Sequence, residues 1–232
     1  MTSIVKLNSS QSDVPDISKQ MSKSENTVLK TAKRHYTELT TTEPPLKRSR
    51  ISSAIQESSP VEEDFHPDLS FAINKLYRAA GLTITSQPVE ENGSKGAEYV
   101  AHRLGINDQT VAFRVGKITP SRAGNFVTLW KRPSGENEPI DLSDKVAFVI
   151  VDVSSEIGQS GQFIFDQHVL VEQKIFSVSS KNQKGKMAFR VFPPWAKPKP
   201  SAIKTQRWQS RYFFQFSSER IPFSTILKLF KV

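Results

Sequence analysis

The sequence predicts a domain of α/β or α+β class in which helices flank a mixed β-sheet of about five or six strands. Three patterns support this prediction: apolar residues recur every three or four positions after residue 67, at every second position from residue 111, and almost without interruption over residues 146–153. These patterns are typical of an amphipathic helix, of a strand, and of a central strand covered on both faces. Because the strands follow one another without a helix between each pair, a doubly wound parallel sheet is not expected.

The first helix is expected between Pro67 and Gly81. Pro67 and Asp68 suit a helix start, and glycine commonly ends a helix. The apolar residues between them lie on one helical face: Leu69, Ala72, Ile73, Leu76 and Ala80. A second, short helix is expected over residues 97–104, closed by Gly105, because four apolar residues again share one face.

Strands are expected where the apolar period changes to two. Residues 111–115 and 126–131 alternate in this way and are expected to be neighbouring strands joined by a turn. Residues 146–153 form the central strand, and three shorter strands are expected over residues 162–165, 169–175 and 187–192. After a proline-rich turn, residues 203–214 have helical spacing, and residues 223–230 fit a terminal helix or strand.

Composition divides the chain into a tail and one domain. Residues 1–64 are rich in Ser and Thr and contain only one of the chain's aromatic residues, Tyr36, so we expect them to be disordered. Residues 65–216 are expected to form one α/β domain, followed by a C-terminal extension over residues 217–232. The tail contains nine Lys or Arg and nine Asp or Glu, so the whole net charge of +9 lies in the rest of the chain. A basic domain attracts polyanions such as nucleic acid.

Several function classes are excluded or not indicated. The absence of cysteine excludes a cysteine nucleophile, a thiolate metal site and a disulfide scaffold. Neither a glycine-rich dinucleotide turn nor a phosphate-binding loop motif occurs. No apolar run is long enough for a membrane span or a signal sequence, so we expect an intracellular protein without a membrane partner. A basic run at Lys47, Arg48 and Arg50 is either a nuclear localisation signal or a solvated charge cluster, so the expected location is cytoplasmic or nuclear.

Six segments of the chain resemble the MepB family. They are YVAHR at 99–103, FRVGKITP at 113–120, GNFVTLWKR at 124–132, GQFIF at 161–165, FRVFPPW at 189–195 and KTQRWQSRYF at 204–213. The resemblance covers about residues 67–214. It implies a fold similar to the PD-(D/E)XK nuclease core, in which helices flank a mixed sheet, and an affinity for DNA or RNA. It does not by itself imply catalysis.

A metal-dependent nuclease is the first alternative function. Nucleases of the PD-(D/E)XK type hold Mg²⁺ or Mn²⁺ with a strand-end Asp and with an acidic residue two positions before a Lys. The weak candidates here are Asp152, Glu172 and Lys174, although no proline precedes Asp152. Glu172 and Lys174 equally fit the solvated face of a strand, and His102 and His168 belong to no metal-binding spacing. We therefore predict no cofactor and no metal ligand unless the protein is this nuclease.

The prediction of nucleic-acid binding rests on cations interleaved with aromatic rings. Arg and Lys neutralise phosphates, and flat rings stack on unpaired bases. The predicted binding residues are Arg114, Lys117, Trp130, Lys131, Arg132, Arg190, Trp195, Lys204, Arg207, Trp208 and Arg211. Two questions stay open. The tryptophans either stack on bases or belong to the core, and Arg114 and Arg190 either face a groove or pair with a buried carboxylate such as Glu98 or Asp152.

The sequence therefore predicts a MepB-like protein that binds single-stranded DNA or RNA with low sequence specificity and without catalysis. Low specificity is expected because no base-reading helix motif is present, and single strands are expected because stacking needs exposed bases. A second alternative is a protein-interaction module whose basic face docks acidic partners. The sequence indicates neither an oligomeric state nor a choice between DNA and RNA.

Overall fold

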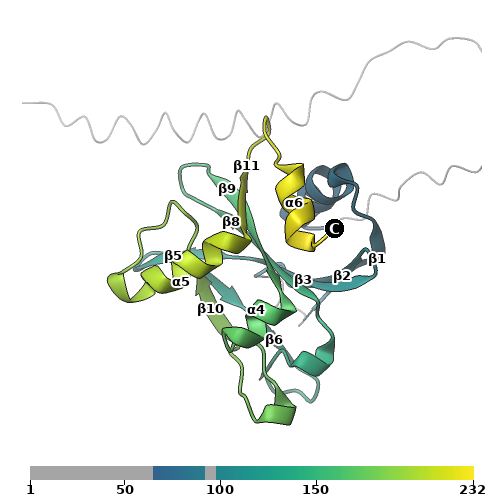
Figure 1. Cartoon of the computed structure of the whole chain (residues 1–232), viewed down its shortest axis with the longest axis vertical. Helices are drawn as coiled ribbons and strands as arrows, with labels where there is room; N and C mark the ends of the chain where they lie inside the picture. The colour runs from purple at the N-terminus through teal and green to yellow at the C-terminus, as the bar shows by residue number, and fades with distance from the viewer. Residues whose placement is uncertain (1–64, 92–97) are drawn as a thin grey trace, which may run out of the picture. The chain divides into compact units, whose positions relative to one another are not determined.

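The computed structural model describes residues 65–91 and 98–232 (Figure 1). Their main feature is a six-stranded sheet with the order β1-β2-β3-β8-β9-β11. Neighbouring strands are antiparallel except β3 and β8, which are parallel. The strands are β1 (Ile84–Glu90), β2 (His102–Ile106), β3 (Gln109–Val115), β8 (Phe148–Ser154), β9 (Ser160–Asp166) and β11 (Phe213–Phe216). The expected tail over residues 1–64, with its basic run at Lys47, Arg48 and Arg50, lies outside the described residues.

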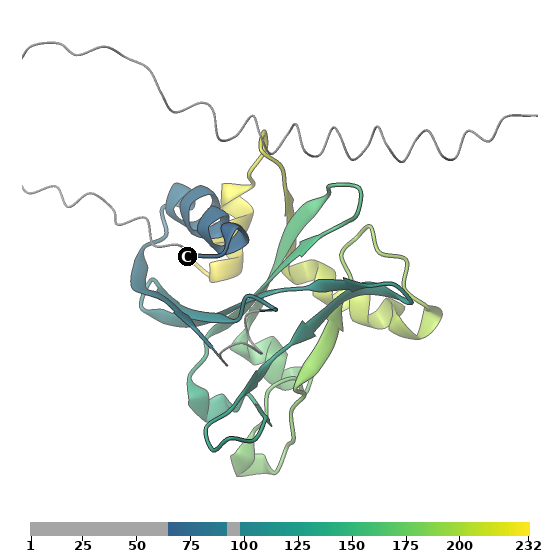
Figure 2. The ribbon, with the colours of Figure 1, turned by 180° about the vertical axis from the view of Figure 1, so that it is seen from behind.

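Both faces of this sheet are covered, as Figures 1 and 2 show. One face, the helix face, packs against α2 (Pro67–Phe71), η1 (Ala72–Tyr77), η2 (Arg78–Ala80) and α6 (Phe223–Phe230). The other, the hairpin face, packs against α4 (Gln167–Glu172), α5 (Ile203–Gln209) and a small sheet of β10 (Ala188–Val191), β5 (Arg122–Thr128) and β4 (Lys117–Thr119). The predicted class, helices flanking a mixed sheet, is confirmed.

Short elements complete the chain. A two-stranded sheet joins β6 (Trp130–Lys131) to β7 (Glu138–Pro139). Single 3-10 turns occur at η3 (Leu142–Asp144), η4 (Ser179–Lys181), η5 (Pro200–Ala202) and η6 (Ser210–Tyr212). In the ranges 65–91 and 98–232, none of the helices has both the length and the apolar character needed to cross a membrane.

The position of the central strand β8 between two cores explains why its sequence is almost entirely apolar. Phe148 and Ile150 pack into the core of the helix face, whereas Val149, Val151 and Val153 pack into the core of the hairpin face. A strand with a core on each side must be apolar at successive positions and not at alternate ones. The prediction of a covered central strand is confirmed.

The first helix begins and ends where the sequence predicts, although its middle is a π-helix. The side chain of His66 accepts a hydrogen bond from the backbone N–H of Asp68, and Pro67 occupies the first turn. Gly81 ends the helix in the left-handed region, with φ of +84°, which glycine adopts without a steric penalty.

The second predicted helix is wrong. Within residues 98–104, the structure has a turn at 98–100 followed by β2, which pairs with both β1 and β3. Val100 and Leu104 do lie in one core, as the helical pattern required, but a turn followed by a strand brings them there. Gly105 lies inside β2 because β1 is close: a Cβ at this position would lie 2.7 Å from the hydroxyls of Ser86 and Thr85.

The predicted strand over residues 169–175 is also wrong. This segment contains α4, whose N-cap Asp166 accepts a hydrogen bond from the backbone N–H of Val169 at 2.9 Å. A run of apolar residues only a few positions long does not distinguish a strand from a helix. Here the N-cap carboxylate satisfies a free N–H group of the first turn and favours the helix.

Two further expectations about segment boundaries are corrected. Residues 111–115 and 126–131 are not neighbouring strands, because β3 lies in the large sheet and β5 in the small one. The helical segment after residue 203 ends before Phe213, where β11 begins. The shorter strands predicted over residues 162–165 and 187–192 are confirmed as β9 and β10.

Residues 217–232, expected as an extension, contain α6. Its side chains Ile226 and Phe230 are buried in the core of the helix face. The Phe230 ring lies 5.2 Å from that of Phe148 and 5.8 Å from that of Tyr77. The extension therefore covers part of the central sheet.

Candidate nucleic-acid interface

Arg114 forms a structural ion pair and does not face a groove. Its side chain is 1% exposed, and its Nη2 donates a hydrogen bond to Oε2 of Glu91 at 2.8 Å. Its Nη1 donates to the backbone oxygen of Phe113 at 2.8 Å. Burial lowers the pKa of Arg114, and the carboxylate of Glu91 opposes this shift. The buried partner is thus Glu91, not Glu98 or Asp152.

Two other predicted cations are neutralised by neighbouring acids. Lys117 donates to Oε1 of Glu98 and lies 4.7 Å from the centre of the Tyr99 ring. Lys131 donates to Oδ1 of Asp144 at 2.7 Å. A phosphate would have to compete with these carboxylates, so both lysines are poor sites for a polyanion.

Trp130 and Arg132 contact each other. Trp130 is 9% exposed, and the guanidinium of Arg132 lies 5.3 Å from its ring centre. Arg132 also donates two hydrogen bonds to Oδ1 of Asn137, at 2.7 and 3.0 Å. With so little of its surface exposed, Trp130 belongs to the core and not to a stacking surface.

The remaining predicted cations belong to a stretch of the chain without acids. Between Glu172 and Glu219 there is no Asp or Glu. Ten cations lie in this interval: Lys174, Lys181, Lys184, Lys186, Arg190, Lys197, Lys199, Lys204, Arg207 and Arg211. None of the ten has an ion pair within the described part of the chain, and all except Arg190 are exposed. We call these ten residues the basic flank.

The basic flank follows one side of the domain. Figures 1 and 2 show the segment from the end of α4 through β10 to α5 along the same side of the molecule. On α5 and the following turn, Lys204, Arg207 and Arg211 are spaced three and four residues apart, so they lie on one helical face. These cations therefore lie on one continuous stretch of the chain, and the small sheet places Arg190 and Lys117 on either side of Phe126, with which both are paired.

A small cavity opens within the basic flank. It has a volume of about 290 Å³, and its walls include Lys186, Phe189, Arg190 and Trp208. The Trp208 ring is half-buried and lies 5.4 Å from that of Phe165. Trp208 therefore packs against the core on one side and lines the cavity on the other.

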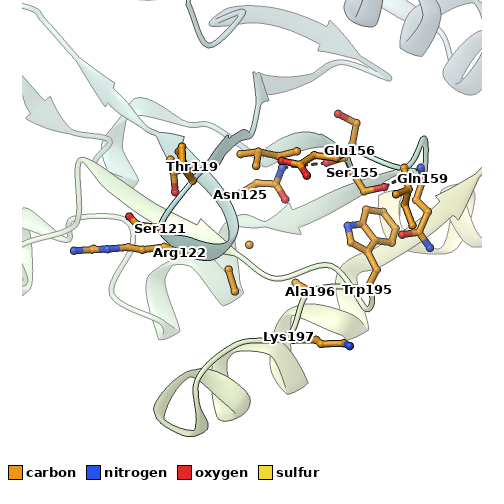
Figure 3. Close-up of a pocket in the computed structure, with 16 residues that line it drawn as sticks. Thr119, Ser121, Arg122, Asn125, Ser155, Glu156, Gln159, Trp195, Ala196 and Lys197 are labelled. Atoms are coloured by element: carbon orange, nitrogen blue, oxygen red, sulfur yellow. Dashed lines mark hydrogen bonds between the residues drawn. The ribbon is translucent and has the colours of Figure 1, made fainter. Parts of the chain in front are cut away.

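Figure 3 shows a larger cavity. Its volume is about 580 Å³. Its walls come from three segments: the β4–β5 hairpin, the loop 154–159 after β8, and the turn 195–197. We call it the hairpin cavity. Trp195 and Lys197 lie on one side of it, and Arg122 lies on the hairpin.

Arg190 joins the two cavities. Its Nη2 donates to Oγ1 of Thr119 at 2.7 Å, and its Nη1 donates to the backbone oxygen of Gly124 at 3.3 Å. Its guanidinium also lies 5.6 Å from the centre of the Phe126 ring. Burial, followed by the nearby charge of Arg122, lowers the pKa of Arg190. Among the described residues, Arg190 thus pairs with no carboxylate, and its hydrogen bonds hold the hairpin in place.

The structure does not bring the three nuclease candidates together. Asp152 is 8% exposed and lies on the helix face of the sheet, between the hairpin-face residues Val151 and Val153. Glu172 ends α4 on the hairpin face, and Lys174 follows it, both exposed. The sheet separates Asp152 from Glu172. In the described ranges, no group of three or more His, Asp or Glu side chains could hold a metal ion.

The surroundings of Asp152 are those of a neutral buried acid. Its carboxylate accepts a hydrogen bond from Gln162, whose Nε2 donates to Oδ2 at 2.7 Å. Gln162 in turn accepts a hydrogen bond from the hydroxyl of Tyr77 at 2.9 Å. Burial raises the pKa of Asp152 to about 7, and the charge of Asp68 adds to this rise.

Sequence reasoning missed Arg122 and Lys186 as lining residues. The missed signal was the absence of acids between residues 172 and 219, which the charge of the whole domain conceals. A regional count of charge would have pointed to the basic flank. It would not have identified Arg122, which reaches the hairpin cavity from another segment.

Comparisons with known proteins agree with this fold. A family model described as MepB-like matches residues 93–215. A solved structure described as the crystal structure of MepB aligns with a TM-score of 0.54 and 30% sequence identity, over 65% of this chain and 96% of that chain. No curated protein matches the chain. Because the family model spans more than half of the sequence and the MepB structure is matched almost throughout, the chain belongs to the MepB-like family.

Proposed function

We propose that this protein binds single-stranded nucleic acid through the basic flank, with little sequence specificity and without cleaving it. The observation behind this proposal is a run of ten cations, from Lys174 to Arg211, that no acid neutralises within the described residues. Most other proteins intersperse both signs of charge on their surfaces. A one-sided positive field instead attracts polyanions and releases their counterions on binding.

Aromatic rings beside the cations favour single strands. Trp208 and Phe189 line the smaller cavity, and Trp195 lines the hairpin cavity. All three are half-buried, so each has a fixed position and an accessible part. Unpaired bases can stack on such rings, whereas the bases of a duplex are already stacked on one another.

The geometry also supports low specificity. The exposed helix of the basic flank, α5, has only seven residues, and the cations on it are lysines and arginines suited to phosphates. Phosphate contacts position a nucleic acid but do not read its sequence. We therefore expect DNA and RNA single strands of different sequence to bind with similar affinity.

Nothing in the geometry favours the nuclease alternative, since Asp152 and Glu172 lie on opposite sides of the central sheet. Two-metal and one-metal hydrolysis both need acidic ligands that converge on one point. The protein-interaction alternative would use the same flank, and competition between heparin and a single strand would not separate the two. Direct binding of DNA and RNA does.

The test uses fluorescence anisotropy of labelled single-stranded DNA and RNA at several salt concentrations. The triple variant Lys204→Ala, Arg207→Ala, Arg211→Ala removes three cations from the basic flank. We expect weaker binding and a log–log salt slope that is smaller by about 2, since each lost phosphate contact contributes about 0.7 on a single strand.

The matched control removes the same charge from the helix face. The variant Lys75→Ala, Arg78→Ala, Lys228→Ala replaces three exposed cations there, and we expect nearly unchanged binding. Equal losses in the two triple variants would contradict a localised interface. Dissociation constants above roughly 100 μM at physiological salt, for both DNA and RNA, would contradict nucleic-acid binding itself.

A further inference from the structure

The hairpin cavity has the size of a small-molecule site. Its volume of about 580 Å³ lies within the range of roughly 300 to 1,000 Å³ that such sites occupy. Its walls combine apolar groups with hydroxyl and amide side chains of Ser121, Ser155 and Gln159. It is open to solvent and does not include Arg114, Lys117 or Lys131.

Hydrogen bonds of Arg190 and of the lining residue Asn125 hold the walls of the cavity. Arg190 connects β10 to the hairpin through Thr119 and Gly124. Asn125 connects the hairpin to the end of β8, because its Nδ2 donates to the backbone oxygens of Gly116 at 3.2 Å and Ser154 at 3.4 Å. A site that is held in this way loses little freedom when a ligand binds.

Gly124 shows how closely the hairpin approaches β10. Its φ is +75°, and a Cβ there would collide with the backbone of Val191 and the ring of Phe192. Only glycine satisfies both conditions without strain. The position of the hairpin wall therefore depends on this residue as well as on Arg190.

Trp195 offers the cavity an anchored ring. Its centroid lies 5.5 Å from that of Phe213, with the two planes at 77°. This edge contact ties the indole to the core of the hairpin face, while the half-buried side chain still lines the cavity. A ring that is already fixed stacks on a ligand at low entropic cost.

The charges around the cavity favour the binding of an anion. Arg122 and Lys197 are exposed, and neither has an ion pair within the described residues. Arg122 and Arg190 are near enough that the charge of one lowers the pKa of the other. Glu156 is the one carboxylate among the lining residues that the structure describes. A phosphate near these cations would relieve their mutual repulsion.

We infer that the hairpin cavity binds one nucleotide unit, with the base against Trp195, its phosphate near Lys197, and the next phosphate of the strand near Arg122. This inference rests on the proposed function and adds to it a defined site for a single base. A free phosphate would not use the ring, and a neutral aromatic ligand would not use the cations. A base that carries a phosphate uses both.

The test measures binding of adenosine 5′-monophosphate by NMR titration, with adenosine and inorganic phosphate as the partial ligands. We expect a dissociation constant on the order of 1 mM for the monophosphate and weaker binding of either part. Trp195→Ala should weaken the monophosphate by between roughly fivefold and a hundredfold, the loss that removal of one stacking ring causes. Trp195→Phe keeps a ring and should bind the monophosphate more tightly than the alanine variant; equal binding by the two variants would contradict stacking on this ring.

The cations have matched controls in the same proline-rich segment. Lys197→Ala should weaken the monophosphate but not adenosine, whereas Lys199→Ala, two residues along and outside the cavity lining, should change neither. Arg122→Ala should weaken the dinucleotide pApA more than the monophosphate. Equal effects of Lys197→Ala and Lys199→Ala would overturn the assignment of the phosphate.

The outcome is distinguishable from that of the proposed function. A dissociation constant of the monophosphate above roughly 10 mM overturns this inference alone if the protein still binds single-stranded DNA and the triple variant Lys204→Ala, Arg207→Ala, Arg211→Ala still weakens that binding. Monophosphate binding without binding of any single strand overturns the proposed function and leaves a site for a free nucleotide. Failure of both ligands overturns both.

Discussion

Asp152 is expected to destabilise the protein at neutral pH. It is buried on the helix face, and its carboxylate receives one hydrogen bond, from Gln162. It borders a cavity of about 230 Å³ together with Asp68, which adds a like charge. An ionised carboxylate in such surroundings loses most of its hydration without gaining a cation.

The magnitude follows from the pKa. Burial raises the pKa of Asp152 from its usual 3.8 to about 7, and each unit corresponds to about 1.4 kcal/mol. The unfolded chain releases the proton near pH 3.8, whereas the folded protein keeps it until about pH 7. Asp152 therefore lowers the free energy of unfolding as pH rises between these values, by at most about 4 kcal/mol, and adds no further loss above pH 7.

The substitution Asp152→Asn keeps the shape of the side chain and removes this titration. Relative to the wild type, we expect the variant to gain stability steadily from pH 4 to pH 7, approaching about 4 kcal/mol at pH 8. Urea unfolding followed by tryptophan fluorescence at closely spaced pH values measures the difference. The matched control is Asp108→Asn, the same change at an exposed turn residue, for which we expect only a small change in the free energy of unfolding.

The result that would refute the reasoning is a stability difference between wild type and Asp152→Asn that is constant from pH 4 to pH 8. It would mean that Asp152 titrates at the same pH in both states, so that burial does not govern its charge. A variant that loses stability relative to the wild type as pH rises would show that the ionised carboxylate makes a favourable contact in the folded protein.

Three further predictions concern the fold and the nuclease alternative. Arg114→Leu should cost about 1 to 3 kcal/mol in thermal unfolding, because it removes the hydrogen bonds of Arg114 to Glu91 and to the backbone oxygen of Phe113 and leaves Arg103 as the remaining ion-pair partner of Glu91 among the described residues; an unchanged melting temperature would show that the Arg114–Glu91 pair is dispensable. Gly105→Ala should cost about 1 to 3 kcal/mol, since the new Cβ would lie 2.8 Å from the backbone nitrogen of Ser86, and a melting curve equal to that of the wild type would mean that β1 moves aside freely. When the protein is incubated with single-stranded DNA and Mg²⁺ or Mn²⁺, we expect no cleavage that depends on Glu172, because Glu172 and Asp152 do not share a face of the sheet. Cleavage by the wild type that disappears in Glu172→Ala would establish the nuclease alternative.

Local patterns in the sequence determine much of this fold. The apolar run before Asp152 predicts a strand with a core on each side, and the apolar spacing from Leu69 to Ala80, bounded by Pro67 and Gly81, predicts the first helix. These patterns work because the side chains that share a face of a helix or strand are only two to four residues apart. The net positive charge of the domain is likewise a property of the sequence alone.

Short segments were predicted less well, because a few apolar residues satisfy two periods at once. Val100 and Leu104 fit a helix face and also a turn followed by β2, and the pairing of β2 with strands on both sides decides between them. Residues 169–172 fit a strand, but Asp166 accepts the N–H of Val169 and starts a helix. In both segments, contacts outside the apolar pattern select the structure.

Only the tertiary structure decides which cations are available to a ligand. Arg114 and Glu91 are separated by 23 residues in the chain, and no local pattern indicates that they pair. The same is true of Asp152 and Glu172, whose twenty-residue separation suits a metal site until the sheet places them on opposite faces. A charge is free or neutralised according to what lies within a few ångströms of it, and that distance is set by the packing of segments remote in sequence.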